Sequence, residues 1–186
     1  KGVQASFTEI KGFECMRSDG IEFARQMQRT IIEMIVREQR PPVALIDFLM
    51  EQREKVLEGH LNLGDVTITK AMTKPMGSYK SNLPHLTVAK IMKERGAEVY
   101  TGMKVPYVVV GQKPGLQVIW AEDYQGTYDV DYYWSRIVLP PTHRILEVLY
   151  PTVQWELLYS GKEQTRRMAL RAKGLPVAPV NGDEEA

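Results

Sequence analysis

Two aspartates separated by one residue, Asp129 and Asp131, are the closest approach to a paired carboxylate in the sequence. Two carboxylates at positions i and i+2 on one face of a strand can hold a divalent metal ion, as a metal-dependent nuclease requires. These two, however, open the helical pattern Asp131-Tyr132-Tyr133-Trp134, where a carboxylate caps the helix and favours its positive N-terminal end. Both interpretations stay open at this point, with helix capping the simpler one.

Other catalytic motifs are missing from the sequence. It contains no G-x-x-x-x-G-K-[ST] loop, no G-x-S-x-G elbow and no H-E-x-x-H pair. The single cysteine, Cys15, excludes an internal disulfide and indicates a reducing compartment. Together with His60, His85 and His143 it shows no metal-ligand spacing, so no metal or other cofactor is expected in this chain.

A basic stretch over residues 69–95 carries the clearest binding signal. It has six basic residues and one acid in a chain whose formal net charge is only +1. Short hydrogen-bonding side chains are interleaved with the lysines, as in proteins that meet phosphate oxygens. A helix that begins at Pro84 would add free N–H groups at its start. The stretch predicts contact with a nucleic-acid backbone without base readout, although by charge alone a solvated basic loop is the better interpretation.

The elements that must hold these residues are mostly helical. Apolar spacing predicts helices over residues 21–38, 42–58 and 84–95, and two short helices over 129–138 and 142–150 separated by Pro140-Pro141. Alternation predicts strands over residues 7–16, 105–110 and 117–121. Residues 161–186 form a basic and then acidic tail that lacks a packing pattern, and we expect it to be disordered. No apolar run reaches the roughly 18 residues of a membrane span, and we expect a cytoplasmic, DNA-associated protein without membrane contact.

Four blocks of this sequence, in the right order, resemble family-B DNA polymerases over about three quarters of the chain. The central block is Ile68-Thr69-Lys70-Ala71-Met72-Thr73-Lys74, followed by Tyr79 and by Leu83-Pro84-His85-Leu86-Thr87-Val88-Ala89. Upstream, residues 11–19 are similar to the end of the family's palm, with Ser18 where the pattern has a second arginine. Downstream, the blocks are residues 96–107 and the run Asp129 to Tyr133, Leu139-Pro140 and Arg144 to Glu147.

This resemblance implies an α+β fold: a mostly helical thumb domain with a small β-rich tip and an N-terminal strand that completes a palm sheet. Residues 1–20 would be the end of the palm, residues 21–160 the thumb and residues 161–186 the tail. The thumb of such enzymes wraps primer–template DNA behind the active site. By position in the motifs, the DNA-binding residues would be Arg17, Thr69, Lys70, Lys74, Tyr79, Lys80, Asn82 and His85.

The family's metal-binding and nucleotide-binding motifs are absent from this sequence, so the chain alone is expected to be inactive. The resemblance implies that Mg²⁺ and the incoming dNTP are held by a large polymerase chain with exonuclease, fingers and palm aspartates. This chain would then be the small subunit of a split polymerase or a piece of a cut one. The tail near Gln164 only weakly resembles a sliding-clamp peptide. The alternative is a stand-alone, sequence-nonspecific DNA-binding protein with a thumb-like fold.

Overall fold

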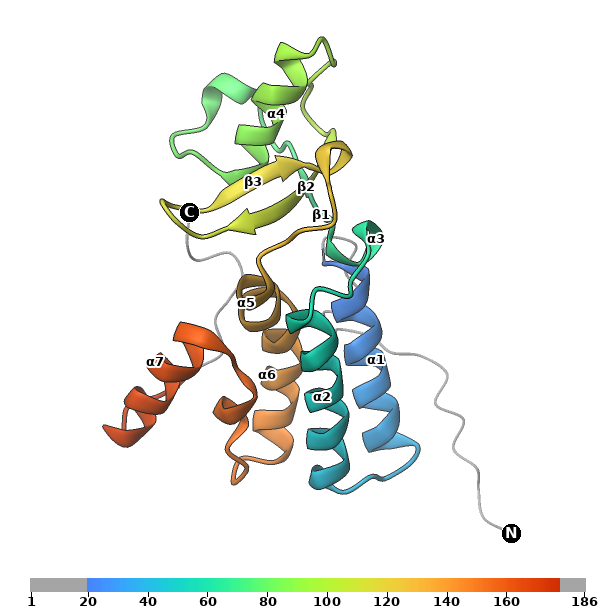
Figure 1. Ribbon diagram of the computed structural model, residues 1–186, viewed down its shortest axis with the longest axis vertical. Coiled ribbons are helices and arrows are strands. Elements are labelled where there is room, and N and C mark those ends of the chain that lie inside the picture. The colour runs from blue at the N-terminus through green and yellow to red at the C-terminus, as the bar shows by residue number, and fades with distance from the viewer. Residues whose placement is uncertain (1–19, 178–186) are drawn as a thin grey trace.

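Apolar residues that recur every three or four positions form two long helices at the start of the computed structural model, which describes residues 20–177 (Figure 1). Helix α1, Glu22–Val36, buries Met27 and Ile31, and helix α2, Pro42–Leu57, buries Leu45 and Leu49 on the facing side. Both helices confirm the sequence prediction. The predicted strand over residues 7–16 lies outside the described residues.

The residues between α2 and the end of the sheet form a small tip. The short helix α3, Leu63–Val66, leads into strand β1, Ile68–Ala71, which pairs antiparallel with β2, Lys104–Gly111. Strand β3, Gln117–Trp120, completes the order β1-β2-β3, and helix α4, Pro84–Glu94, packs on β2 and β3. The expected α+β fold with a small β-rich tip is confirmed.

A continuous helical run follows the tip, and here the prediction of two separate helices was wrong. Helix α5, Val130–Tyr132, passes through the π-helical segment η4, Tyr133–Val138, directly into helix α6, Leu139–Leu149. Pro140 and Pro141 fall in the first turn of α6, where the backbone N–H that proline lacks is dispensable. The prolines therefore lie where η4 passes into α6, and they do not interrupt the helical run.

Part of the expected disordered tail is a helix. Helix α7, Gly161–Ala172, follows the 3₁₀ turn η5, Trp155–Leu158, and packs against it. Glu163 and Arg167 are buried, and Arg167 Nε donates to Glu163 Oε1 at 2.7 Å. Arg171 also donates to Glu156 Oε1, at 2.6 Å. Ion pairs replace the missing apolar pattern on this helix, which explains why the prediction failed over residues 161–172.

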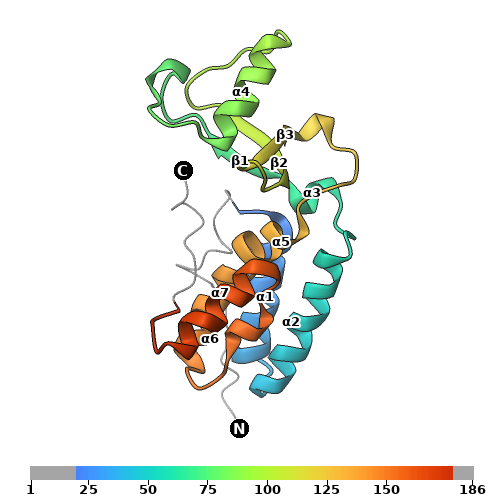
Figure 2. The ribbon, with the colours of Figure 1, turned by 60° about the vertical axis from the view of Figure 1, so that its left-hand side comes forward.

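We call α1, α2, α5 to α7, η4 and η5 the helical lobe, and residues 68–123 the tip. The tip lies at one end of the helical lobe (Figure 2). Two tyrosine hydroxyls bond at this junction: that of Tyr133 links the lobe to the tip, and that of Tyr128 links the segment after the tip to α2. Tyr133 Oη donates to the Val66 carbonyl at 2.6 Å and accepts from the Val109 amide at 3.2 Å. Tyr128 Oη donates to the Val56 carbonyl at 2.8 Å. Burial raises the pKa of both tyrosines, so both hydroxyls stay protonated and keep these bonds at neutral pH.

Two short 3₁₀ turns complete the tip. They are η2, Met76–Ser78, between β1 and α4, and η3, Ala121–Asp123, directly after β3. The residues around η2 form a loop that carries half of the predicted DNA-binding side chains: Lys74, Tyr79, Lys80 and Asn82. This loop lies on the same side of the molecule as the turn between β2 and β3 (Figure 1).

Candidate nucleic-acid interface

The loop between β1 and α4, residues 72–83, is organised by one tyrosine hydroxyl. Tyr79 Oη accepts from the backbone N–H of Thr73 at 2.9 Å and of Lys74 at 3.3 Å, and lies 3.3 Å from the Thr73 hydroxyl. The bond with the Thr73 side chain, followed by the backbone bonds, lowers the pKa of Tyr79. The sequence singled out Tyr79 as a contact residue, and the structure adds that it closes the loop.

Lys74 and His85 both contact the ring of this tyrosine. The Lys74 ammonium is 4.9 Å from the centre of the Tyr79 ring, within the range of a cation–π contact. The His85 ring meets the Tyr79 ring edge-on at a centroid distance of 5.8 Å. Residues separated by eleven positions in the sequence therefore form one cluster, which we call the Tyr79 cluster: Thr73, Lys74, Tyr79 and His85.

Lys70, on strand β1, affects the protonation of His85 in this cluster. Partial burial, and then the Lys70 charge, lower the pKa of His85 below its ordinary value of 6.5. His85 is therefore neutral at pH 7 in the free protein and offers one ring N–H as a donor. Lys70 itself is half-buried and lies opposite Val105 in the sheet register. The structure thus brings Lys70, Lys74, Tyr79 and His85 of the predicted set together.

The other predicted residues are less closely associated with the Tyr79 cluster. Lys80 and Asn82 are exposed in the loop before α4, and Thr69 is half-buried on β1 opposite Pro106. Leu83, the N-cap residue of α4, provides no side-chain cap, and Pro84 occupies the first turn as predicted. Arg17 lies outside the described residues. The geometry therefore gives no direct support for Thr69, Lys80 and Asn82 as members of one cluster.

Arg95 shows that some cations of the basic stretch stabilise the tip itself. Its guanidinium forms two bonds with the Asp123 carboxylate, at 2.7 and 2.8 Å, and lies 5.6 Å from the centre of the Trp120 ring. The hydrogen bonds raise the pKa of Arg95 and lower that of Asp123. By contrast, the structure records no ion pair for Lys74 or Lys80 with any acid in residues 20–177. These two exposed lysines keep their charge available for a ligand.

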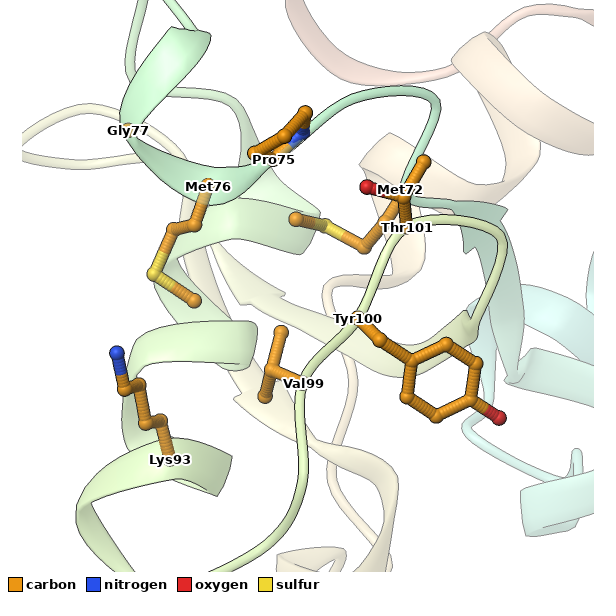
Figure 3. Close-up of a pocket in the computed structure, with 8 residues that line it drawn as sticks. All are labelled: Met72, Pro75, Met76, Gly77, Lys93, Val99, Tyr100 and Thr101. Carbon is orange, nitrogen blue, oxygen red and sulfur yellow. The ribbon is translucent and has the colours of Figure 1, made fainter.

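A small pocket lies behind the loop, and no pattern in the sequence indicates it. Its volume is about 270 Å³, and Figure 3 shows Met72, Met76 and Val99 pointing toward one another, with Lys93 at one side. Tyr100 is exposed and turned away from this apolar group (Figure 3). No carboxylate, histidine or cysteine lines the pocket, so it offers neither a general base nor a metal ligand. It gives the loop an apolar support.

The aspartate pair has a structural role in the helical lobe. Asp129 Oδ1 accepts from the Tyr132 amide at 2.8 Å, which caps α5, and from Gln112 Nε2 at 3.0 Å. Asp131 lies against Gly161 at the start of α7. Within residues 20–177, no three His, Cys, Asp or Glu side chains gather as a metal site would require. The capping interpretation is confirmed, and the geometry gives no support to the metal-dependent nuclease.

None of the helices in the described part of the chain is long and apolar enough to cross a membrane.

Comparison with known proteins identifies relatives that match most of the chain. Residues 2–149 match the sequence profile of DNA polymerase family B. DNA polymerase 2 of Aeropyrum pernix is 29% identical over 170 residues, which are 89% of this chain and 21% of that protein. A DNA polymerase of Pyrococcus glycovorans is 32% identical over 142 residues, 74% of this chain and 18% of that protein. The chain therefore spans about a fifth of the length of these relatives.

A solved structure shares the fold. The family B DNA polymerase from the hyperthermophilic archaeon Pyrobaculum calidifontis superposes with a TM-score of 0.61 at 29% sequence identity. The superposition covers 70% of this chain and 18% of that polymerase.

Proposed function

The chain belongs to DNA polymerase family B, and we propose that it is the non-catalytic part of such a polymerase that grips primer–template duplex during DNA synthesis. The Tyr79 cluster is the observation that carries this proposal. It places Lys74, the Thr73 hydroxyl and the exposed Lys80 on one loop and His85 at the start of α4. Lys70 on β1 is close enough for its charge to lower the pKa of His85.

The chemistry of these groups fits a phosphate backbone better than base edges. Ammonium groups, a hydroxyl and a neutral imidazole N–H all donate to phosphate oxygens, which every DNA sequence presents. Of the predicted DNA-binding residues, only His85 lies on helix α4, at its start, so we propose no base-reading role for this helix. The grip should therefore be independent of sequence and weaken steeply with salt.

We also propose that the chemistry of nucleotide addition resides outside these 186 residues. Phosphoryl transfer in this family needs two metal ions held by aspartates, and the aspartates Asp129 and Asp131 cap and pack the helical lobe. A polypeptide with the exonuclease, fingers and palm would hold Mg²⁺ and the dNTP, and this chain would add the thumb. Such a complex works on DNA within the cell. Sliding-clamp contact is a minor part of the proposal.

Duplex affinity tests the grip directly. The double substitution Lys70→Ala plus Lys80→Ala should weaken binding of the chain to duplexes of different sequence by similar factors. The slope of log affinity against log salt should fall by about two, one unit for each lost phosphate contact. Lys55→Ala, which removes an exposed lysine of α2 that pairs with Glu51 at 2.8 Å, is the matched control and should leave the slope unchanged. A loss that depends on DNA sequence would contradict a backbone grip.

Primer extension tests the dependence on a second polypeptide. The chain is mixed with a large polymerase chain that carries the aspartate motifs, and extension is measured with and without it. We expect no extension by this chain alone and longer products from the mixture. Equal extension with and without the chain would overturn the proposed role in synthesis.

A stand-alone DNA-binding protein is the second candidate, because the Tyr79 cluster would serve either function. It would bind duplex as tightly alone as with the large chain, and a pull-down would recover no polymerase partner. Duplex titrations in the presence and absence of the large chain separate the two functions.

A further inference from the structure

The pocket behind the loop of the Tyr79 cluster is held open by backbone bonds. The Met72 amide donates to the Met103 carbonyl at 2.8 Å, and the Gly102 amide donates to the Met72 carbonyl at 2.6 Å. The Met103 amide also donates to the Tyr100 carbonyl at 3.2 Å, so residues 100–103 form a turn fixed against the end of β1. Met72 itself is buried. The pocket is therefore preformed in the free chain.

The side chains around this pocket suit an apolar anchor. Met72, Met76 and Val99 point toward one another (Figure 3), and Met76 and Val99 are only half-buried. Methionine side chains adapt their shape to a partner. The volume of about 270 Å³ is below the range of about 300–1,000 Å³ that is typical of sites for free small molecules. One aliphatic or aromatic side chain of a larger partner is the better fit.

An uncovered aromatic side chain lies beside the pocket. Tyr100 lines its edge, is 62% exposed and is the only exposed aromatic residue within residues 20–177. Its ring is turned outward, away from the methionines (Figure 3). Tyrosine and methionine are both enriched in protein–protein interfaces, and tyrosine is often one of the few residues that dominate the affinity. Tyr100 and the pocket together therefore indicate a polypeptide partner.

Lys93 sets the charge of this surface. It lies in the last turn of α4, at one side of the pocket, and it is the only charged residue among those described that line the pocket (Figure 3). It is exposed and forms no ion pair with an acid of the described chain. The tip as a whole has eight basic and four acidic residues. A complementary partner carries an aspartate or glutamate next to its apolar anchor.

We propose that Met72, Met76, Lys93, Val99 and Tyr100 form a docking surface for a segment of the large polymerase chain, with an apolar side chain in the pocket and a neighbouring carboxylate on Lys93. This surface rests on the proposed function, in which a second polypeptide supplies catalysis, and adds one place where the two chains meet. The chain spans about a fifth of the length of related polymerases, so most of such a polymerase lies outside it. A DNA phosphate would meet Lys93 but leave the apolar walls uncovered, which favours a protein.

Calorimetric titration of the chain with the large polymerase chain, without DNA, tests this surface. Tyr100→Ala removes an exposed ring, so it should leave the fold intact and weaken binding by about tenfold or more. Met76→Ala should have a similar effect, and Lys93→Glu should weaken binding severalfold, most strongly at low salt. Leu116→Ala, which removes an exposed apolar side chain from the turn between β2 and β3, is the matched control and should bind as wild type does. Undiminished binding by both Tyr100→Ala and Lys93→Glu would overturn the docking surface and leave the proposed function standing.

Lysine acylation, read by mass spectrometry, distinguishes a protein on this surface from a nucleic acid. With the large chain and no DNA, we expect Lys93 to be protected and Lys55 to remain reactive. With saturating duplex alone, Lys93 should remain reactive, whereas Lys74 and Lys80 should be protected. Protection of Lys93 by duplex or single-stranded DNA but not by the large chain would overturn this inference. If the wild-type chain neither binds the large chain nor adds to primer extension, the proposed function fails and this surface fails with it.

Discussion

The helical lobe and the tip use charged side chains in opposite ways. In the helical lobe, Glu163 and Arg167 are buried, bonded to each other at 2.7 Å, and the Arg167 guanidinium lies 3.9 Å from the centre of the Tyr159 ring. At the tip, Lys74 and Lys80 are exposed. Charges of the first kind hold helices in place, and charges of the second kind are available to a ligand. Local net charge alone does not separate the two kinds, because residues 162–173 are also rich in arginine and lysine.

The contrast predicts that stability and DNA affinity respond to different cations. Substitutions of the buried ion pairs in the helical lobe should destabilise the fold, and substitutions of the exposed lysines Lys74 and Lys80 at the tip should weaken binding while leaving the fold intact. The following predictions, ordered from the largest expected effect to the smallest, test this separation.

Arg167→Ala should have the largest effect. It leaves the buried Glu163 carboxylate without its closest partner and removes the cation from the Tyr159 ring. We expect the free energy of unfolding, measured with urea, to fall by about 3–5 kcal/mol, as when one member of a buried ion pair is removed. Lys55→Ala, which breaks an exposed pair, should cost about 0.5 kcal/mol or less. A loss of less than 1 kcal/mol in the free energy of unfolding of Arg167→Ala would contradict the proposed difference between the helical lobe and the tip.

His143 should make the helical lobe sensitive to acid. Burial and the Arg167 charge lower its pKa to about 4, whereas the unfolded chain has an ordinary histidine pKa near 6.5. The unfolded state therefore binds the extra proton first, so stability is fully present above pH 6.5 and falls as the pH is lowered toward 4. The free energy of unfolding should drop by roughly 2 kcal/mol between pH 7 and pH 5. Urea titrations of wild type and His143→Gln at both pH values measure it, and the variant should lack this component.

Tyr79→Phe distinguishes the contribution of the loop's shape to duplex affinity from the contribution of its charge. It removes the hydroxyl that accepts from the Thr73 and Lys74 amides but keeps every lysine. One such bond contributes about 0.5–1.5 kcal/mol, so these two amides should exchange hydrogen faster and duplex affinity should fall severalfold. Global stability of the helical lobe should not change. Unaltered affinity would mean that the loop needs only its charges.

His85 should give the smallest effect, a pH dependence of DNA binding. Its pKa is lowered in the free protein by partial burial and by Lys70, whereas a nearby phosphate favours the imidazolium. Binding therefore takes up a proton, and affinity should rise by roughly threefold as the pH falls from 7.5 to 6. Duplex titrations of wild type and His85→Asn measure this effect. An identical pH dependence in both proteins would remove His85 from the interface.

Much of this fold could be predicted from local sequence signals. Prolines at the start of helices and glycines after them marked α2 and α4, and Gly59 and Gly96 have the positive φ values of 78° and 86° that such ends require. That the chain stays helical through Pro140 and Pro141 could not be predicted, because this depends on the π-helical segment η4 before them. Helix α7 was missed because ion pairs with η5 hold it, and sequence periodicity does not show ion pairs.

The candidate site was predicted as a set of residues but not as an arrangement. Motif positions indicated Lys70, Lys74, Tyr79 and His85, and these four do lie together. That the Tyr79 hydroxyl closes the loop, and that the His85 ring of α4 meets the Tyr79 ring, depends on how this part of the chain folds back on itself. Such contacts are set by tertiary packing, which the spacing of residues along one chain does not encode.

The hydroxyl of Tyr133 bonds to Val66 at the entry to the tip and to Val109 in its central strand. A sideways load on the tip, such as a moving duplex exerts, is therefore transmitted to the helices partly through a single oxygen atom. The tip should move with the helical lobe as one rigid unit, and Tyr133→Phe should make this joint more flexible without altering any charge on the side proposed to face DNA.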